Sequence, residues 1–149
     1  MIISPSLAKE YPQISIWICD NLPKVRDKTK IFKAFQKYAR MSEKVAERAI
    51  KHGTPPNIDY RYLPADNGVF DKKYPTYVFI SQTICKKFRD ADSTDKSGMS
   101  TLIESTILHE MVHWGNSLDG EKDSHSEMGK AFEKEAYGKD VRAPWSKTP

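Results

Sequence analysis

The chain has 149 residues, of which 38% are hydrophobic and 30% are charged, and its formal net charge is +4. This length predicts one domain over residues 1–149 with a sizeable core, and the composition excludes a disordered chain. No stretch approaches the roughly 20 apolar residues that a transmembrane helix needs. Lysines and arginines are interleaved with acids rather than grouped in blocks, so nucleic-acid binding is not indicated.

Two further features bear on the compartment of the protein. The first residues lack the basic and apolar regions of a secretory signal. We therefore expect a cytosolic protein, a protein exported by a route that does not read such a signal, or a piece of a longer protein. The only cysteines, Cys19 and Cys85, each follow an isoleucine, which predicts buried free thiols rather than a disulfide.

The first half of the chain is predicted to be helical. Apolar residues at spacings of three and four predict a helix from Ser6 to Leu22, in which Pro12 separates a short first turn from the rest. The same spacing continues after Asp27, a plausible N-cap, until Gly53 supplies a stop signal. We predict a single helix of about 24 residues in this second segment.

The middle of the chain changes to a strand pattern. Alternating apolar residues from Ile58 and a short apolar run over 77–80 predict two or three short strands. Residues 64–68 supply turn chemistry between them. Ser81 is the expected N-cap of another helix, and residues 90–98 are expected to form a polar loop.

Two helices are predicted in the last third. The first starts near Thr101, which has capping-box spacing to Glu104, and ends at Gly115. Because this helix is apolar on most sides, it is expected to run through the middle of the domain. The second covers about Ser126 to Tyr137. The predicted fold is therefore α+β, mainly helical, with a small β-sheet beside the first of these two helices.

The stretch His109–His113 reads His-Glu-Met-Val-His and lies in this central helix. Residues four apart project from the same helical face, so the imidazoles of His109 and His113 can bind one metal ion. Zinc accepts neutral imidazole, and catalytic zinc sites keep one position open for water. Glu110 is placed to take a proton from that water and return it to a leaving amine. The motif therefore predicts a zinc-dependent metallopeptidase with Glu110 as general base.

The third metal ligand is expected downstream of the motif. Glu127, at the start of the last helix, is the predicted ligand because it can return to the metal face after a short loop. Its capping-box spacing from Ser124 gives it a competing structural role. His125 and Glu133 are the alternative ligands.

Several other residues have possible roles around such a site. A peptidase must stabilise an oxyanion, and Tyr137, His125 and Tyr77 carry suitable donors. Gly129 lowers the stability of the last helix, which predicts a close approach to the metal-bearing helix. The strand over 76–81 is either an ordinary core strand or an edge strand that pairs with substrate.

Three stretches, His109–Gly115, Glu127–Glu133 and Tyr137–Gly138, together resemble a known family. They look like the zincin-type, gluzincin-like metallopeptidase toxin domains of bacterial polymorphic toxins and type VI secretion spike effectors. The resemblance implies zinc held by His109, His113 and Glu127. It also implies an antibacterial effector that acts on protein in the target-cell periplasm, with a cognate immunity protein in the producing cell.

Two other interpretations remain open from the sequence. The SprT-like proteases share a His-Glu-Met-x-His stretch and a downstream histidine near which His125 would lie, and the basic charge suits a protease acting on DNA-bound protein. The other interpretation is a non-catalytic interaction module stabilised by zinc. Structural zinc sites of that kind are closed by four protein ligands.

Overall fold

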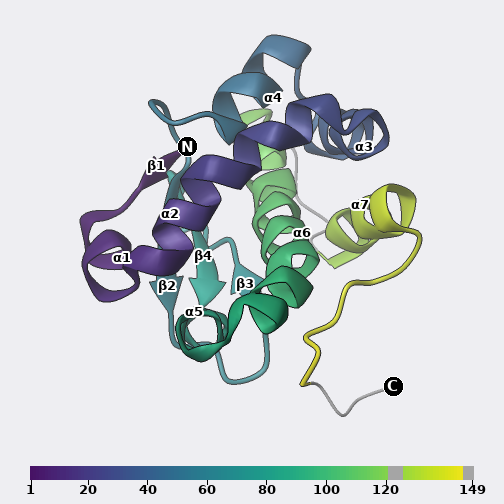
Figure 1. Cartoon of the computed structure of the whole chain (residues 1–149). Coiled ribbons are helices and arrows are strands. Elements are labelled where there is room, and N and C mark those ends of the chain that lie inside the picture. The colour runs from purple at the N-terminus through teal and green to yellow at the C-terminus, as the bar shows by residue number, and fades with distance from the viewer. Residues whose placement is uncertain (121–125, 146–149) are drawn as a thin grey trace.

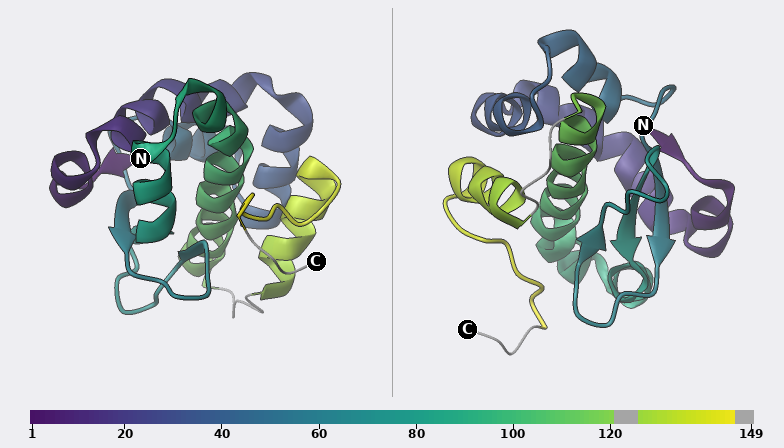
Figure 2. Two further views of the ribbon diagram at one scale, coloured as in Figure 1. Left: turned by 60° about the horizontal axis from the view of Figure 1, so that its bottom comes forward. Right: turned by 180° about the vertical axis from the view of Figure 1, so that it is seen from behind.

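The computed structural model describes residues 1–120 and 126–145, with their side chains except those of Ser126 and Glu127. Helices make up most of the structure, and a small mixed sheet lies beside a long central helix, α6 (Ser93–Leu118). The last helix, α7 (Ser126–Tyr137), lies on the other side of α6 in both Figure 1 and the right-hand view of Figure 2. The prediction of a mainly helical α+β fold is confirmed.

The chain begins with two short helices, α1 (Pro5–Glu10) and α2 (Pro12–Asn21), followed by a 3-10 helix, η1 (Leu22–Asp27). Each α-helix has proline in its first turn, where the missing N–H removes no bond within the helix. The hydroxyl of Ser4 caps α1 by accepting a backbone N–H of that turn. The predicted break at Pro12 is confirmed.

The next helical region differs from its prediction. The single long helix is wrong, because the chain forms two helices, α3 (Thr29–Ala39) and α4 (Glu43–Ile50). Arg40 adopts a left-handed conformation at the end of α3, with φ of 57°. The Ser42 hydroxyl then accepts the Val45 N–H and starts α4. Both helices bury apolar residues in the same core, so the apolar spacing continues across the break.

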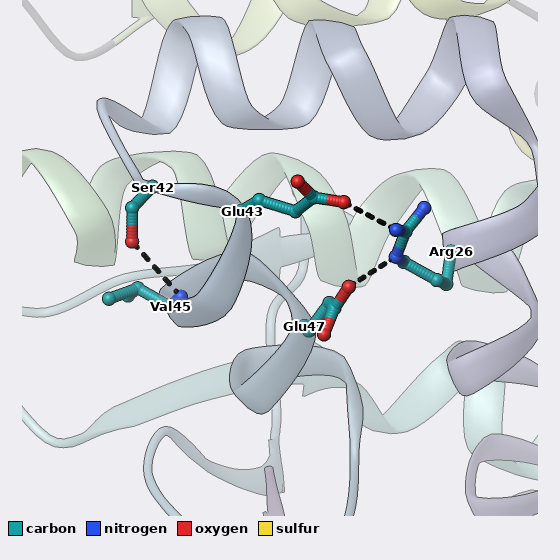
Figure 3. Close-up of polar contacts among 5 residues, drawn as sticks. All are labelled: Arg26, Ser42, Glu43, Val45 and Glu47. Carbon is teal, nitrogen blue, oxygen red and sulfur yellow. Dashed lines mark hydrogen bonds and ion pairs between the residues drawn. The ribbon is translucent and has the colours of Figure 1, made fainter.

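Ion pairs hold α4 against the preceding 3-10 helix. Figure 3 shows the guanidinium of Arg26 between the carboxylates of Glu43 and Glu47, with the Ser42 cap at the start of the same helix. The guanidinium also lies 5.0 Å from the ring centroid of Phe32 in α3. These contacts tie α4 to the 3-10 helix after the break, although ion pairs this exposed add little to stability.

Four short strands form the sheet in the order β1-β2-β4-β3. They are β1 (Ile2–Ile3), β2 (Asn57–Arg61), β3 (Gly68–Val69) and β4 (Tyr77–Ser81). β1 and β2 are parallel, as are β2 and β4, while β3 runs antiparallel to β4. The sequence predicted two or three strands and missed β1, which at two residues is too short to give a periodic signal.

The sheet packs one face against the helices. Ile58, Val78 and Ile80 are buried, and Ile58 pairs in register with Val78. β4 has a partner on each side, so the proposed role of residues 76–81 as an edge strand is wrong, and β4 is a core strand. The free edge on this side of the sheet belongs to β3.

Two more predictions concern the helices around β4. The Ser81 hydroxyl accepts the Thr83 N–H and caps α5 (Gln82–Asp90), as expected. α6, however, starts earlier than Thr101, because Asp92 caps it and residues 93–98 are helical rather than loop.

The other end of α6 also differs from the prediction, because the helix continues past Gly115 to Leu118. Gly115 serves close packing instead, since a Cβ there would lie 2.5 Å from the carbonyl oxygen of Ala39 in α3. Within the described ranges, no helix has the length and apolar character required to cross a lipid bilayer. Both cysteines are free thiols, as predicted, but Cys85 is buried and Cys19 is exposed.

Candidate metal centre and active site

The central helix brings two imidazoles and a carboxylate together. His109 and His113 lie one turn apart on α6, with ring centroids separated by 5.1 Å and planes inclined at 62°. One ligand-type atom from each of His109, Glu110 and His113 lies within 4.8 Å of the other two. The three predicted residues of the motif therefore converge, as the helical spacing requires.

Two of these side chains, those of His109 and Glu110, border a small polar pocket. Glu110 and His113 are each 7% exposed, so the chemistry is set into the protein rather than on an open helical face. The pocket has a volume of about 140 Å³, which is room for an ion and several water molecules. A larger pocket of about 530 Å³ lies near Trp145, but no residue of the motif lines it. The smaller pocket is therefore the candidate active site, on the ground of its chemistry rather than its size. Its walls are formed by residues of four segments: Asp66, Asn67, Gly68, Thr106, Glu133 and Val141.

The buried carboxyl of Glu110 has an unusual protonation equilibrium. Burial raises its pKa to about 7, while the charge of His109 opposes the shift. The carboxylates of Glu133 and Asp66 add to the increase. A carboxyl group whose pKa lies near neutrality can both accept and release a proton, which is the requirement for a general acid–base group.

His109 is held by a second carboxylate. Its Nδ1 shares a hydrogen bond with Oε2 of Glu133 in α7. Burial lowers the pKa of His109, but the hydrogen bond to Glu133 and the nearby charge of Glu110 more than offset this, so the pKa is raised overall. The same negative surroundings that favour a proton on this ring favour a metal cation at the site.

Two glycines bring backbone close to the motif. A Cβ on Gly129 of α7 would lie 2.2 Å from Nε2 of His109, which confirms the predicted close approach. A Cβ on Gly68 of β3 would lie 3.0 Å from Cγ of Glu110 and 2.9 Å from Cγ2 of Thr106. The ligand helix is therefore contacted directly by backbone from both neighbouring elements.

The third-ligand candidates differ in what the structure describes. Glu127 belongs to the first turn of α7, but its side chain lies outside the described residues, as does the whole of His125. Glu133 is described and does not belong to the group of converging ligand atoms. Its carboxylate instead contacts Nδ1 of His109 and the backbone N–H of Val141.

The predicted oxyanion donors do not line the pocket where they are described. The Tyr137 hydroxyl donates a 2.7 Å hydrogen bond to Oε2 of Glu104. Oε1 of Glu104 is paired with Nζ of Lys28 at 2.6 Å. The ring of Tyr77 stacks on that of Phe79, with a centroid separation of 5.7 Å. Neither tyrosine is a wall residue of the pocket beside Glu110.

Sequence reasoning missed the pocket residues that come from elsewhere in the chain. Asn67 and Val141 are wall residues, although neither belongs to a motif. Asn67 falls in the turn predicted over 64–68, and its carbonyl accepts the Ser81 N–H at 2.7 Å. The turn composition was the one available signal, and it carries no information about which helix the turn contacts.

The donor set suits a divalent metal. Two imidazoles four residues apart on one helix, beside a buried carboxylate, are ligand types and a spacing that transition metals accept. A carboxylate on the second nitrogen of a ligating histidine is the usual outer partner in such sites.

Comparison with known proteins agrees with this chemistry. The sequence model of the family described as "Metallopeptidase toxin 3" matches residues 7–138. No curated protein and no solved structure matches the chain. Residues 7–138 include part of α1, all the later helices, three of the four strands and every residue of the histidine–glutamate motif. The chain therefore belongs to the metallopeptidase toxin 3 family.

Proposed function

We propose that the chain is a zincin-type zinc endopeptidase in which His109, His113 and Glu127 hold the metal and Glu110 is the general base. The observation that carries the proposal is the convergence of His109, Glu110 and His113, of which His109 and Glu110 line a small polar pocket. Membership of a metallopeptidase family implies a bound metal and a protein or peptide substrate.

The path of α7 supports Glu127 as the third ligand. Gly129 places the first turns of α7 against the His109 ring, and Glu127 lies two residues earlier in that helix. Among the described residues, the converging group has three members, His109, Glu110 and His113.

The residues around the pocket divide the work of hydrolysis. Zinc, when bound, supplies Lewis-acid activation of the substrate carbonyl and of water. Glu110 takes a proton from the attacking water as the new C–O bond forms, and gives it to the amine nitrogen as the C–N bond breaks. Asn67 carries a neutral amide donor on the pocket wall, and we assign it the stabilisation of the developing oxyanion.

The sheet edge offers a place for the substrate backbone. β3 pairs with β4 on one side, and among the described residues no strand pairs with its opposite side. Residues 66–68, which lead into β3, line the pocket beside Glu110. A peptide pairing along β3 would pass the catalytic carboxylate and be held by backbone hydrogen bonds, which carry little sequence preference.

The biological role that fits this activity is that of an antibacterial effector. The family is one of toxins, and a peptidase that damages a competitor must be neutralised in the producing cell by an immunity protein. We propose that the domain acts in the target-cell periplasm. Expression with an added export signal should then slow growth, whereas the same chain kept in the cytosol should not. Equal toxicity in both compartments would overturn the periplasmic assignment.

Two substitution experiments test the chemistry. Glu110→Gln should leave zinc bound and reduce peptide hydrolysis by at least about 100-fold, because the proton acceptor is lost while the imidazoles remain. Zinc content should fall in Glu127→Ala and stay unchanged in His125→Ala. Activity retained by Glu110→Gln would refute the base assignment. Zinc lost in the His125 variant alone would transfer the third-ligand role to that histidine.

A further inference from the structure

Glu133 occupies a connecting position between the metal-binding helix and the segment that follows α7. Its Oε2 contacts Nδ1 of His109, and its Oε1 accepts the backbone N–H of Val141 at 3.0 Å. The side chain is 11% exposed, and both of its oxygens have a protein partner. A glutamate with both oxygens bound in this way is held in one orientation.

The contact determines which nitrogen of His109 can bind a cation. A carboxylate accepts hydrogen bonds and donates none, so the imidazole nitrogen facing Glu133 must carry the proton. The proton is then on Nδ1, and Nε2 presents its lone pair. A histidine ligand needs a deprotonated nitrogen toward the metal, and a carboxylate on the other nitrogen fixes both the tautomer and the ring orientation.

We propose that Glu133 is a positioning residue that aligns His109 for a divalent cation, and that Val141 holds Glu133 in place through its backbone N–H. The inference rests on the proposed metal-binding role of His109. It gives Glu133 an indirect role, in which the carboxylate acts on the metal through the imidazole.

The second half of the inference concerns residues 139–145, which follow the stretch matched by the family model. Val141 is a wall residue of the catalytic pocket, and Val141, Ala143 and Trp145 pack against the core as partly buried side chains. Nζ of Lys87 in α5 lies 5.6 Å from the Trp145 ring centroid. The segment is thus anchored beyond Val141, and this fixes the donor that faces Glu133.

The first test measures zinc affinity by competition with a chromophoric chelator. Glu133→Ala should weaken zinc binding by about 10-fold to 100-fold, the usual effect of losing an outer-shell partner, and Glu133→Gln should weaken it less. Glu135→Ala is the matched control, because Glu135 lies on the same helix, is exposed and pairs with Lys37. The control should bind zinc as the unmodified chain does.

A spectroscopic measurement separates positioning from general stabilisation. In the zinc-loaded protein, the proton shared by Nδ1 and Glu133 should give a downfield, exchange-protected NMR signal. Glu133→Ala should lose this signal, and Glu135→Ala should keep it. Its persistence in Glu133→Ala would overturn the proposal, as would unchanged zinc affinity in that variant. Loss of zinc as complete as in His109→Ala would also overturn it, since Glu133 would then be a direct ligand.

The role of Val141 has its own test in the full chain. Val141→Pro removes the N–H that Glu133 accepts, and Ala143→Pro introduces the same ring two residues further along. Zinc affinity in Val141→Pro should fall between those of the unmodified chain and Glu133→Ala, and Ala143→Pro should have little effect. Equal effects of the two prolines would overturn the role of Val141. If the unmodified chain bound no divalent cation, the proposed function itself would be wrong. If zinc affinity were the same with and without Glu133, only the present inference would be wrong.

Discussion

Replacing Gly129 by alanine adds a single Cβ atom, and this atom should displace the ring of His109 at the proposed metal site. The added Cβ would lie 2.2 Å from Nε2, 2.4 Å from Cε1 and 2.7 Å from Cδ2 of His109, whereas ordinary contacts begin at 3.4 Å. Either the imidazole or α7 must therefore move by roughly 1 Å. Because metal–ligand distances are defined to about 0.2 Å, a shift of this size is incompatible with an undisturbed site.

Two effects of opposite sign act on the stability of the metal-free protein. Alanine improves helix propensity by about 1 kcal/mol relative to glycine. Overpacking at a close contact costs about 1–3 kcal/mol. The expected net result for Gly129→Ala is a loss of up to about 2 kcal/mol in the free energy of unfolding, from the difference of these two ranges. Zinc affinity should fall by at least about 10-fold to 100-fold, which is the usual effect of losing a residue that orients a metal ligand.

Gly98→Ala provides the matched control. Gly98 is also inside a helix, but no heavy atom outside its own helix backbone lies within 4 Å of a Cβ placed there. This variant should gain about 0.5–1 kcal/mol of stability and bind zinc normally. Urea denaturation of the metal-free proteins and chelator competition measure the two quantities. If Gly129→Ala were stabilised like the control and bound zinc equally well, the close approach of α7 to the imidazole would be refuted.

Three further predictions address other parts of the structure. Gly68→Ala should displace Glu110 and so reduce kcat by up to about 100-fold, while zinc affinity is retained. An unchanged kcat would contradict the close contact between Gly68 of β3 and Glu110. Tyr137→Phe should lower the free energy of unfolding by about 1–3 kcal/mol, because the buried carboxylate of Glu104 loses a hydrogen-bond donor, and kcat should not change. A loss of kcat would restore Tyr137 as an oxyanion donor. A thiol reagent at pH 8 should label Cys19 in the native protein and Cys85 only after unfolding. Cys85 is buried, and this burial raises the pKa of its thiol to about 12. Two thiols labelled in the native state would contradict this prediction.

The helices were predictable where the local signals agreed. Pro12 separates α1 from α2, and the limits of α7 coincide with the predicted ones. The break at Arg40 was missed because α3 and α4 bury residues in the same core, so the apolar spacing shows no change of phase. Periodicity reports which side of a segment is buried, and it does not report a change in the direction of the helix axis.

The site divides in the same way into local and non-local parts. His109, Glu110 and His113 were predictable, because their relative positions follow from helix geometry alone. Asn67 and Val141 reach the pocket through the packing of β3 and of the segment after α7. Their positions depend on contacts between elements far apart in the chain, and no short-range pattern encodes those contacts.

Two glycines allow backbone from the neighbouring elements to pack directly against the buried motif. Gly129 brings α7 against His109 on one side of α6, and Gly68 brings β3 against Glu110 on the other. A side chain at either position would separate backbone from the motif. At Gly129 the affected group is His109, the proposed metal ligand, and at Gly68 it is Glu110, the proposed proton acceptor. The contacts of α7 and β3 therefore affect different steps. This is why alanine at Gly129 should change zinc affinity, whereas alanine at Gly68 should change kcat.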